Sequence, residues 1–255
     1  MRLRGRKGIR ENLEQQPELV VLDPKQYKGR WSELFGNDRP IHVELGMGKG
    51  QFISGMSVKY PDVNFIGMDM YDELIRRGSE KVRAIHGQVD HEEADASNEA
   101  DRAVEATLAG EGSSFNVRLA LGNVEQIEEI FAPGEIERIY LNFSDPWPKK
   151  KHARRRLTHP RFLNKYSSIL NKNGEIHFKT DSRSLFQFSL NSFAATGLQM
   201  NDISLSLHEG GINEKHVMTE YEGKFVGKGM PIHRCEVIIG EAALRRYHEH
   251  KMDEF

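Results

Sequence analysis

Short apolar runs alternate with longer amphipathic segments along most of this chain, and this alternation restricts the possible folds more than any other feature. Five of the runs are rich in Ile, Val, Leu and Phe, as strands covered on both faces are. They span 41–46, 64–69, 117–122, 138–143 and 174–181, and helices are predicted between them over 51–60, 73–85, 123–131 and 160–171. Strands and helices in alternation predict a parallel, doubly wound α/β sheet with helices on both faces.

The pattern changes after one more helix-like segment at 184–197. Two further strands, 199–207 and 232–240, follow without a helical crossover between them, so we expect them to form an antiparallel pair. A seven-stranded, mostly parallel sheet that ends in this way suggests the class I methyltransferase variant of the Rossmann-like fold.

Composition adds limits on size and setting. The chain has 255 residues, 38% of them hydrophobic, and a formal net charge of −2, which favours one soluble domain over 1–255. Residues 1–30 begin with many cations but lack a following apolar run, so we expect a basic N-terminal arm, with neither a secretion signal nor a membrane span. The single cysteine, Cys235, excludes a disulfide framework and favours a buried thiol in a reducing, cytoplasmic setting.

The small net charge hides two segments of opposite sign. Residues 86–114 hold eight Asp or Glu against one Arg, and few large apolar residues, which predicts a helical or mobile acidic insertion at the surface. Residues 149–156 hold six Lys or Arg and no acid. A polyanionic partner is therefore compatible with the overall charge.

A glycine-rich turn, VELGMGKGQF, follows the first predicted strand. Glu44 ends the strand, and Gly46, Gly48 and Gly50 lie where backbone can approach a ligand without a Cβ between them, although tight packing alone also produces such turns. The spacing is GxGxG, which differs from the dinucleotide pattern GxGxxG. Glu44 would repel a pyrophosphate but suits a ligand with a free amine, so S-adenosylmethionine fits better than NAD.

Two polar residues extend this predicted cofactor site. Asp69 ends the second strand, where a carboxylate can accept hydrogen bonds from both ribose hydroxyls. Asn123 follows the third strand, where its amide could meet an adenine edge or, equally well, cap the next helix.

The stretch DPWPKKKHARRR follows the fourth strand. Asp145 therefore lies at the carboxyl edge of the sheet, where α/β proteins bind ligands, and Pro146 and Pro148 stiffen the loop around Trp147. A proline-terminated strand with a solvated basic helix would explain the prolines but not the aromatic residue or the charge density. The cluster of cations favours phosphate oxygens and hence a nucleic acid.

Four motifs carry a resemblance to a known family: FSDPWPKKKHARRRLTHPRFL, VELGMGKG, FKTD and TEYEGKF. Together they resemble the bacterial tRNA (guanine-N7-)-methyltransferase family, TrmB type, over about residues 40–240. The resemblance implies methyl transfer from S-adenosylmethionine to N7 of a variable-loop guanosine, position 46 of tRNA.

The resemblance also assigns site residues. It makes Glu44, Asp69, Asn123 and Asp145 cofactor-binding, with Asp145 also the catalytic position, and it places Lys149, Asp181 and the segment Thr219 to Glu222 at the substrate. Arg154 and Arg155, from the basic cluster, are expected to bind RNA. The chain departs from the common family pattern at Ser144, Lys151 and Asp69 and in the length of 86–114, and none of these removes a named functional group.

Several of these residues also have structural interpretations. Asp181 follows Thr180 at a strand end, where such a pair is commonly a turn or cap, and Tyr221 could simply pack its ring. His152 and His159 are more typical of phosphate contacts or surface residues than of a metal site, and no metal is expected. The protein could be a monomer or a homodimer.

Guanine N7 carries a lone pair and no proton, so its methylation requires neither an obligatory base nor a covalent intermediate. Asp145 is expected to accept hydrogen bonds from N1 and N2 of guanine and so to reject adenine. Three alternatives remain. One is a class I methyltransferase for another RNA, and another is a class I methyltransferase for a protein or a small molecule, which would not use the basic cluster. The third is a nucleic-acid-binding module with a vestigial core.

Overall fold

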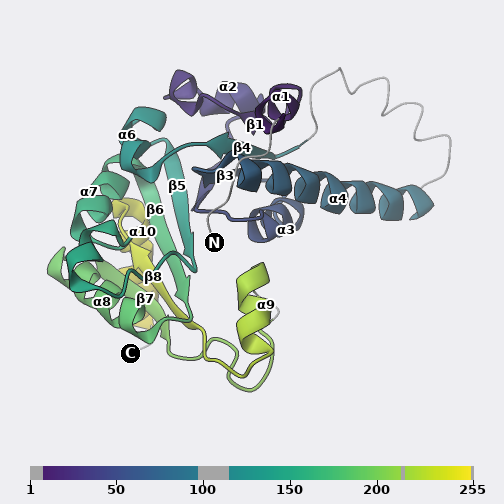
Figure 1. Ribbon diagram of the computed structural model, residues 1–255. Coiled ribbons are helices and arrows are strands. Elements are labelled where there is room, and N and C mark those ends of the chain that lie inside the picture. The colour runs from purple at the N-terminus through teal and green to yellow at the C-terminus, as the bar shows by residue number, and fades with distance from the viewer. Residues whose placement is uncertain (1–7, 97–114, 214–215, 254–255) are drawn as a thin grey trace.

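The computed structural model describes residues 8–96, 115–213 and 216–253, and it is organised around one eight-stranded sheet (Figure 1). The strand order is β1-β4-β3-β2-β5-β6-β8-β7; β8 runs antiparallel to both of its neighbours and the other pairs are parallel. The strands are β1 (Val20–Val21), β2 (Ile41–Leu45), β3 (Asn64–Asp69), β4 (Val117–Leu121), β5 (Ile136–Asn142), β6 (Leu170–Thr180), β7 (Gln199–Ser204) and β8 (His233–Ile238).

All seven predicted strands are present, and the predicted antiparallel pairing of the last two is confirmed. The eighth strand, β1, is the difference: it pairs with β4 at the edge of the sheet and comes from the segment expected to be a basic arm. Two residues are too few to give a periodic signal, so the sequence pattern could not reveal this strand.

Helices cover the sheet on both sides, as predicted. In Figure 1, α6, α7 and α8 lie on one side and α3 and α4 on the other, while α10 packs against β6. The α-helices are α1 (Ile9–Glu14), α2 (Trp31–Phe35), α3 (Gln51–Lys59), α4 (Asp72–Ala96), α6 (Ile127–Ile130), α7 (Pro160–Ile169), α8 (Arg183–Ala195), α9 (Glu220–Val226) and α10 (Glu241–Asp253). Short 3₁₀ helices are η1 (Pro24–Tyr27), η2 (Val124–Gln126) and η3 (Lys150–Arg155).

Successive side chains of each strand point to opposite faces of the sheet, so the core has two layers. In β2, Ile41, Val43 and Leu45 pack into the larger layer beside α6, α7 and α8. In β3, Phe65 packs into the smaller layer with residues of α1, α3 and α4. Cys235 is fully buried, which raises the pKa of its thiol to about 12, so it is inert at neutral pH.

The part of the sheet formed by β5, β6 and β8 differs from the prediction that every strand is covered by apolar residues on both faces. In β6, Ile176 and Phe178 enter the larger core layer, but His177 and Lys179 on the opposite face line a cavity. Polar residues of β5 and β8 continue this surface. Because these side chains are polar and line a cavity, the apolar layer ends here.

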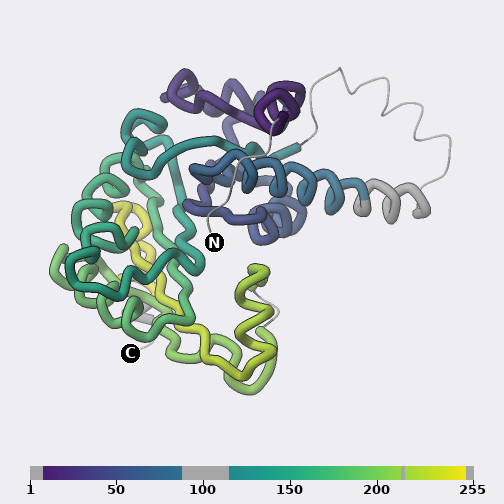
Figure 2. The backbone as a smooth tube through the Cα atoms, in the orientation of Figure 1, coloured from purple at the N-terminus to yellow at the C-terminus, as the bar shows by residue number. Residues whose placement is uncertain are grey.

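The connection between β7 and β8 contains a helix that was not predicted. Figure 2 follows this connection as it leaves the sheet and carries α9 toward α3. Thr219 caps α9 by accepting from the backbone N–H of Glu222, whose side chain accepts in return from the N–H of Thr219. This reciprocal capping box stabilises a helix of only seven residues.

The acidic insertion at 86–114 begins within α4, and its residues 97–114 lie outside the described part of the chain. Within the described residues, no helix combines the length and apolar character needed to cross a bilayer.

Candidate active site

The glycine turn is the first element of the site. Gly46 and Gly48 have φ values of 77° and 57°, which residues with a Cβ adopt only at a cost. Backbone N–H groups of Gly46 and Met47 donate to the carbonyl of Met68 at 2.8 and 3.1 Å, which fixes the turn against β3. A Cβ placed on Gly46 or Gly48 would meet no other described atom within 4 Å, so the open side of the turn faces free space that a ligand can approach.

Asp69 is joined to this turn by a hydrogen bond. Its Oδ2 accepts from the N–H of Gly48 at 3.2 Å and its Oδ1 from the N–H of Tyr71 at 3.2 Å. Burial raises the pKa of this carboxyl, and the backbone donors oppose the shift. Asn123 lies close in the fold because the N–H of Gly122 donates to the carbonyl of Asp69 at 2.9 Å. The amide oxygen of Asn123 caps η2 at 3.0 Å from the N–H of Glu125, so its capping role is present.

Glu44 lies beneath the turn, at 2% exposure, and has an unpredicted partner. The amide Nδ2 of Asn142, on the neighbouring strand β5, donates to its Oε1 at 2.9 Å. Its Oε2 has no hydrogen-bond partner among the described residues. Burial raises the pKa of Glu44 to about 8, although Asn142 and the charge of Lys179 oppose the shift. The sequence pattern missed Asn142 because it ends an apolar strand.

The loop after β5 holds Asp145 in an exposed position. Phe143 and Trp147 have positive φ values of 51° and 41°, a conformation that costs roughly 1–3 kcal/mol for a residue other than glycine. Contacts around the loop offset this cost. The guanidinium of Arg156 donates to the carbonyls of Pro146 and Trp147, both at 3.0 Å. The carboxylate of Asp145 has no partner among the described side chains, so it is free to bind a substrate.

The basic cluster continues from this loop through η3. Lys149, Lys150, Lys151, Arg154 and Arg155 are all exposed. The guanidinium of Arg155 lies over the ring of Trp147, 4.9 Å from its centroid, which orients both side chains. The cluster and Asp145 therefore share one short segment.

Helix α9 closes the other side of the glycine turn. A small cavity of about 60 Å³ is lined by Glu44, Gly46 and Gly48 and also by Thr219 and Tyr221. Glu222 has 0% exposure and its carboxylate meets Lys179 at 2.8 Å and His208 at 2.9 Å. Thr219 and Glu222, predicted at the substrate, thus hold α9 in place, while Tyr221 on the same helix is 55% exposed.

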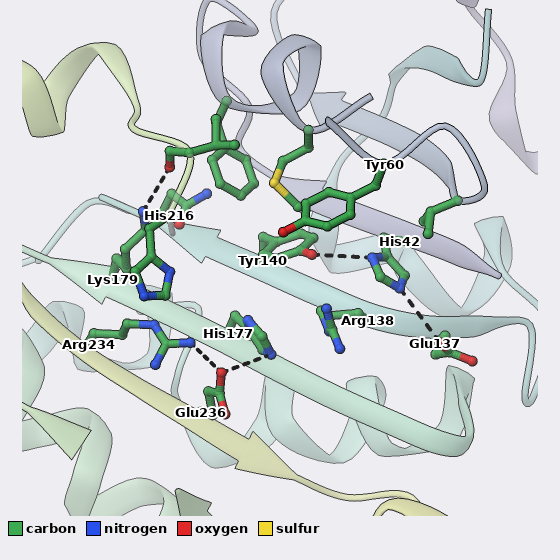
Figure 3. A pocket seen from close by; sticks show the side chains of 15 residues that line it. His42, Tyr60, Glu137, Arg138, Tyr140, His177, Lys179, His216, Arg234 and Glu236 are labelled. Carbon is green, nitrogen blue, oxygen red and sulfur yellow. Dashed lines mark hydrogen bonds and ion pairs between the residues drawn. The ribbon is translucent and has the colours of Figure 1, made fainter. Parts of the chain in front are cut away.

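A larger cavity of about 420 Å³ lies on the polar face of the sheet (Figure 3). Desolvation lowers the pKa values of His42 and His216 to about 4 and also lowers that of His177, so these three rings are neutral at neutral pH. The cations on its floor have carboxylate partners: Arg138 meets Glu175 at 2.9 Å, and Arg234 contacts Glu236 and Asp202. Arg138 and Arg234 are therefore already paired and are poorly suited to bind a phosphate.

The structure therefore brings Glu44, Gly46 and Gly48 together at one cavity. Asp69 joins them through its hydrogen bond with the N–H of Gly48, and Asn123 follows Gly122, which bonds to Asp69. Asp181 is half-buried directly after β6, the strand next to the one that leads into Asp145. Lys149, Arg154 and Arg155 lie on the loop and 3₁₀ helix that follow Asp145. Among the described residues, no group of three or more His, Cys, Asp or Glu is arranged to hold a metal ion.

Comparisons with known proteins fit this geometry. A family model described as a putative methyltransferase matches residues 38–235. Relatives described as tRNA (guanine-N(7)-)-methyltransferase occur in Bacillus licheniformis (44% identical, 92% of this chain, 98% of the relative), Bacillus subtilis (42%, 93%, 98%) and Streptococcus pneumoniae (45%, 92%, 99%).

Solved structures support the fold alone. The 16S rRNA methyltransferase KamB has a TM-score of 0.54 at 11% identity, covering 83% of this chain and 93% of that protein. The 16S rRNA (adenine(1408)-N(1))-methyltransferase of Catenulisporales acidiphilia has a TM-score of 0.52 at 15% identity, covering 87% and 95%.

A mostly parallel sheet with an antiparallel strand near its end, and a glycine turn after its first long strand, is the fold of a class I methyltransferase. With relatives 42–45% identical over more than nine-tenths of its length, the chain belongs to the bacterial tRNA (guanine-N7-)-methyltransferase family.

Proposed function

We propose that this protein transfers a methyl group from S-adenosylmethionine to N7 of a variable-loop guanosine in tRNA, at position 46. One observation carries the proposal: a strained, well-anchored loop presents the carboxylate of Asp145, which has no partner among the described side chains, and continues directly into an exposed basic cluster. The names of the family members support the same substrate and atom.

The residues of the glycine turn fit the cofactor's polar groups. Asp69 would accept from the ribose hydroxyls, Asn123 would meet the adenine edge, and Gly46 and Gly48 would let the backbone approach. Glu44 would accept from the amino group, because its Oε2 is a buried acceptor without a partner among the described residues. When bound, S-adenosylmethionine supplies an electrophilic methyl group on a sulfonium.

The chain's own contribution to the reaction is mainly alignment. The lone pair of N7 attacks directly, so the protein has to hold guanine in line and exclude water. Asp145 would accept from N1 and N2 of guanine and favour the positive charge that forms on the methylated base. Adenine lacks this pair of donors and would be rejected.

The remaining predicted residues would hold the RNA. Lys149, Arg154 and Arg155 would contact phosphates, and Asp181 would border the base. Thr219 and Glu222 would act through α9, by presenting the exposed ring of Tyr221 beside the cofactor cavity.

The wider proposal is a single domain over 1–255 that works in the cytoplasm on tRNA, as a monomer or homodimer. The family relatives cover nearly the full chain, which supports one functional unit. A class I methyltransferase for another RNA or a small molecule is the competing function, and the exposed cluster beside Asp145 argues against the small molecule.

The test uses labelled S-adenosylmethionine and unmodified tRNA transcripts, one with guanosine and one with adenosine at the variable-loop position. Chemical cleavage selective for 7-methylguanosine then locates the label. Label and cleavage only in the guanosine transcript are expected. Label in both transcripts, or in neither while cofactor binds, would contradict the proposed substrate.

A further inference from the structure

Two buried oxygen atoms belong to side chains that line the small cavity beside the glycine turn. Oε2 of Glu44 and Oδ1 of Asn142 both lack a hydrogen-bond partner among the described residues, and both side chains line the cavity. Their exposures are 2% and 7%. A buried polar oxygen without a partner costs about 1–3 kcal/mol, so two on side chains of one cavity indicate a polar ligand group.

The hydrogen bond between these side chains fixes their relative position. Nδ2 of Asn142 donates to Oε1 of Glu44 at 2.9 Å, which leaves the second oxygen of each side chain for a ligand. An ammonium group has three N–H donors and no acceptor, which matches this arrangement. The pairing follows from the sheet register, because Glu44 lies opposite Tyr140 and Asn142 is two residues further on the same face of β5.

We propose that Asn142 is a further cofactor-positioning residue, which together with Glu44 holds the amino group of S-adenosylmethionine, and that this group displaces a proton from the Glu44 carboxyl to solvent. The inference rests on the cofactor of the proposed function. Before binding the carboxyl is neutral and Oε2 carries its proton. Afterwards both oxygens are acceptors, the carboxylate faces an ammonium, and one proton has been released to solvent.

The surrounding charges agree with this exchange. Lys179 of β6 favours the carboxylate of Glu44, whereas Asp69 of β3 opposes it, and burial outweighs both and raises the pKa of Glu44 to about 8. Across the cavity, Lys49 and Glu220 neutralise each other in an ion pair of 2.8 Å. A cation brought against Glu44 therefore adds the stabilisation of the carboxylate that Lys179 and the Asn142 hydrogen bond do not supply against burial.

Calorimetric titration tests the proposal without any turnover. S-adenosylhomocysteine keeps the amino group, and 5′-methylthioadenosine lacks the whole amino-acid tail. Binding enthalpies measured at pH 7 in buffers of different ionisation enthalpy give the number of protons released. We expect close to one proton for S-adenosylhomocysteine and none for 5′-methylthioadenosine. In Glu44→Gln, S-adenosylhomocysteine should release none.

Asn142→Leu should weaken S-adenosylhomocysteine binding about ten-fold, the scale of one hydrogen bond to a charged group, and leave 5′-methylthioadenosine binding unchanged. Asn64→Leu is the matched control. Asn64 is also buried and its Oδ1 also lacks a partner among the described residues, but it begins β3, at the end of the strand away from Asp69 and the cavity. It should change neither ligand's affinity. Thermal unfolding checks that each variant folds, and Glu44→Gln carries the test if Asn142→Leu does not.

Proton release that persists in Glu44→Gln, or an unchanged affinity in Asn142→Leu, would overturn the inference and leave the methyltransferase proposal standing. Failure of the wild-type protein to bind S-adenosylmethionine or S-adenosylhomocysteine at all would overturn both.

Discussion

Lys49 and Glu220 are 171 residues apart in the chain, yet Nζ of the first lies 2.8 Å from Oε1 of the second. The pair joins the glycine turn to the first residue of α9. Both side chains are more than a third exposed, so the pair should contribute less than about 1 kcal/mol to stability. Its effect is on the position of α9.

Lys49→Met should therefore leave the melting temperature nearly unchanged and increase amide hydrogen exchange within α9. Lys25→Met is the control, because Lys25 makes a comparably exposed ion pair with Glu129 far from the site. Equal exchange in α9 of the wild type and Lys49→Met would show that the pair does not hold the helix.

Asp145→Ala should reduce turnover on tRNA by about 100-fold or more, because it removes the acceptor for N1 and N2 of guanine and the charge that favours the cationic product. Cofactor affinity should change much less. Single-turnover kinetics with calorimetric cofactor binding separates the two effects. Normal turnover would disprove the catalytic assignment.

The double variant Arg154→Glu/Arg155→Glu should raise the KM for tRNA at least about ten-fold. It should also reduce the slope of log affinity against log salt concentration by roughly two, since each phosphate contact releases about one counterion. Cofactor affinity should stay the same. Lys172→Glu is a charge-reversal control, since Lys172 is exposed near the amino end of β6, away from the loop of Asp145. An unchanged KM in the double variant would favour a small-molecule substrate.

The raised pKa of Glu44 predicts that the stability of the cofactor-free protein depends on pH in an unusual way. Its pKa rises from 4.5 to about 8 on folding, so the folded state binds more protons than the unfolded state between these values. The stability that Glu44 contributes is present below pH 4.5 and is lost as pH rises toward 8, by roughly 3–5 kcal/mol.

Urea denaturation at pH 5.5 and pH 8.5 measures this loss. Glu44→Gln cannot ionise and should be more stable than the wild type at the higher pH. Glu73→Gln is the control: Arg76 and Arg77 lower the pKa of Glu73 to about 2, so its effect should be equal at both values. A parallel pH dependence of Glu44→Gln and wild type would contradict the assignment.

The sheet and the glycine turn were predictable because their signals are local and repeated. Strand periodicity located β2 to β8, and the carboxyl ends of parallel strands necessarily bring Gly48 and Asp69 together. The residues TEYE at 219–222 also carry a capping-box pattern, but the expected strand pair offered no reason to look for a helix there.

The other features of the site depend on contacts between segments that are distant in the sequence. Asn142 could not be recognised as the partner of Glu44 without the register of β2 and β5. Lys179 lies in an apolar run, and its buried pairing with Glu222 follows only from the position of α9. The exposure of Asp145 depends on two positive φ values that no residue type at those positions predicts.

The central claim is that this protein methylates N7 of guanine in tRNA, and a single-atom change in the substrate tests it most directly. A transcript with 7-deazaguanosine at the variable-loop position keeps the Watson–Crick edge that Asp145 should bind but has C–H in place of N7. We predict full methyl transfer to the guanosine transcript and none to the 7-deaza transcript, which should still compete for the enzyme with similar affinity. Equal transfer to both transcripts would contradict the claim.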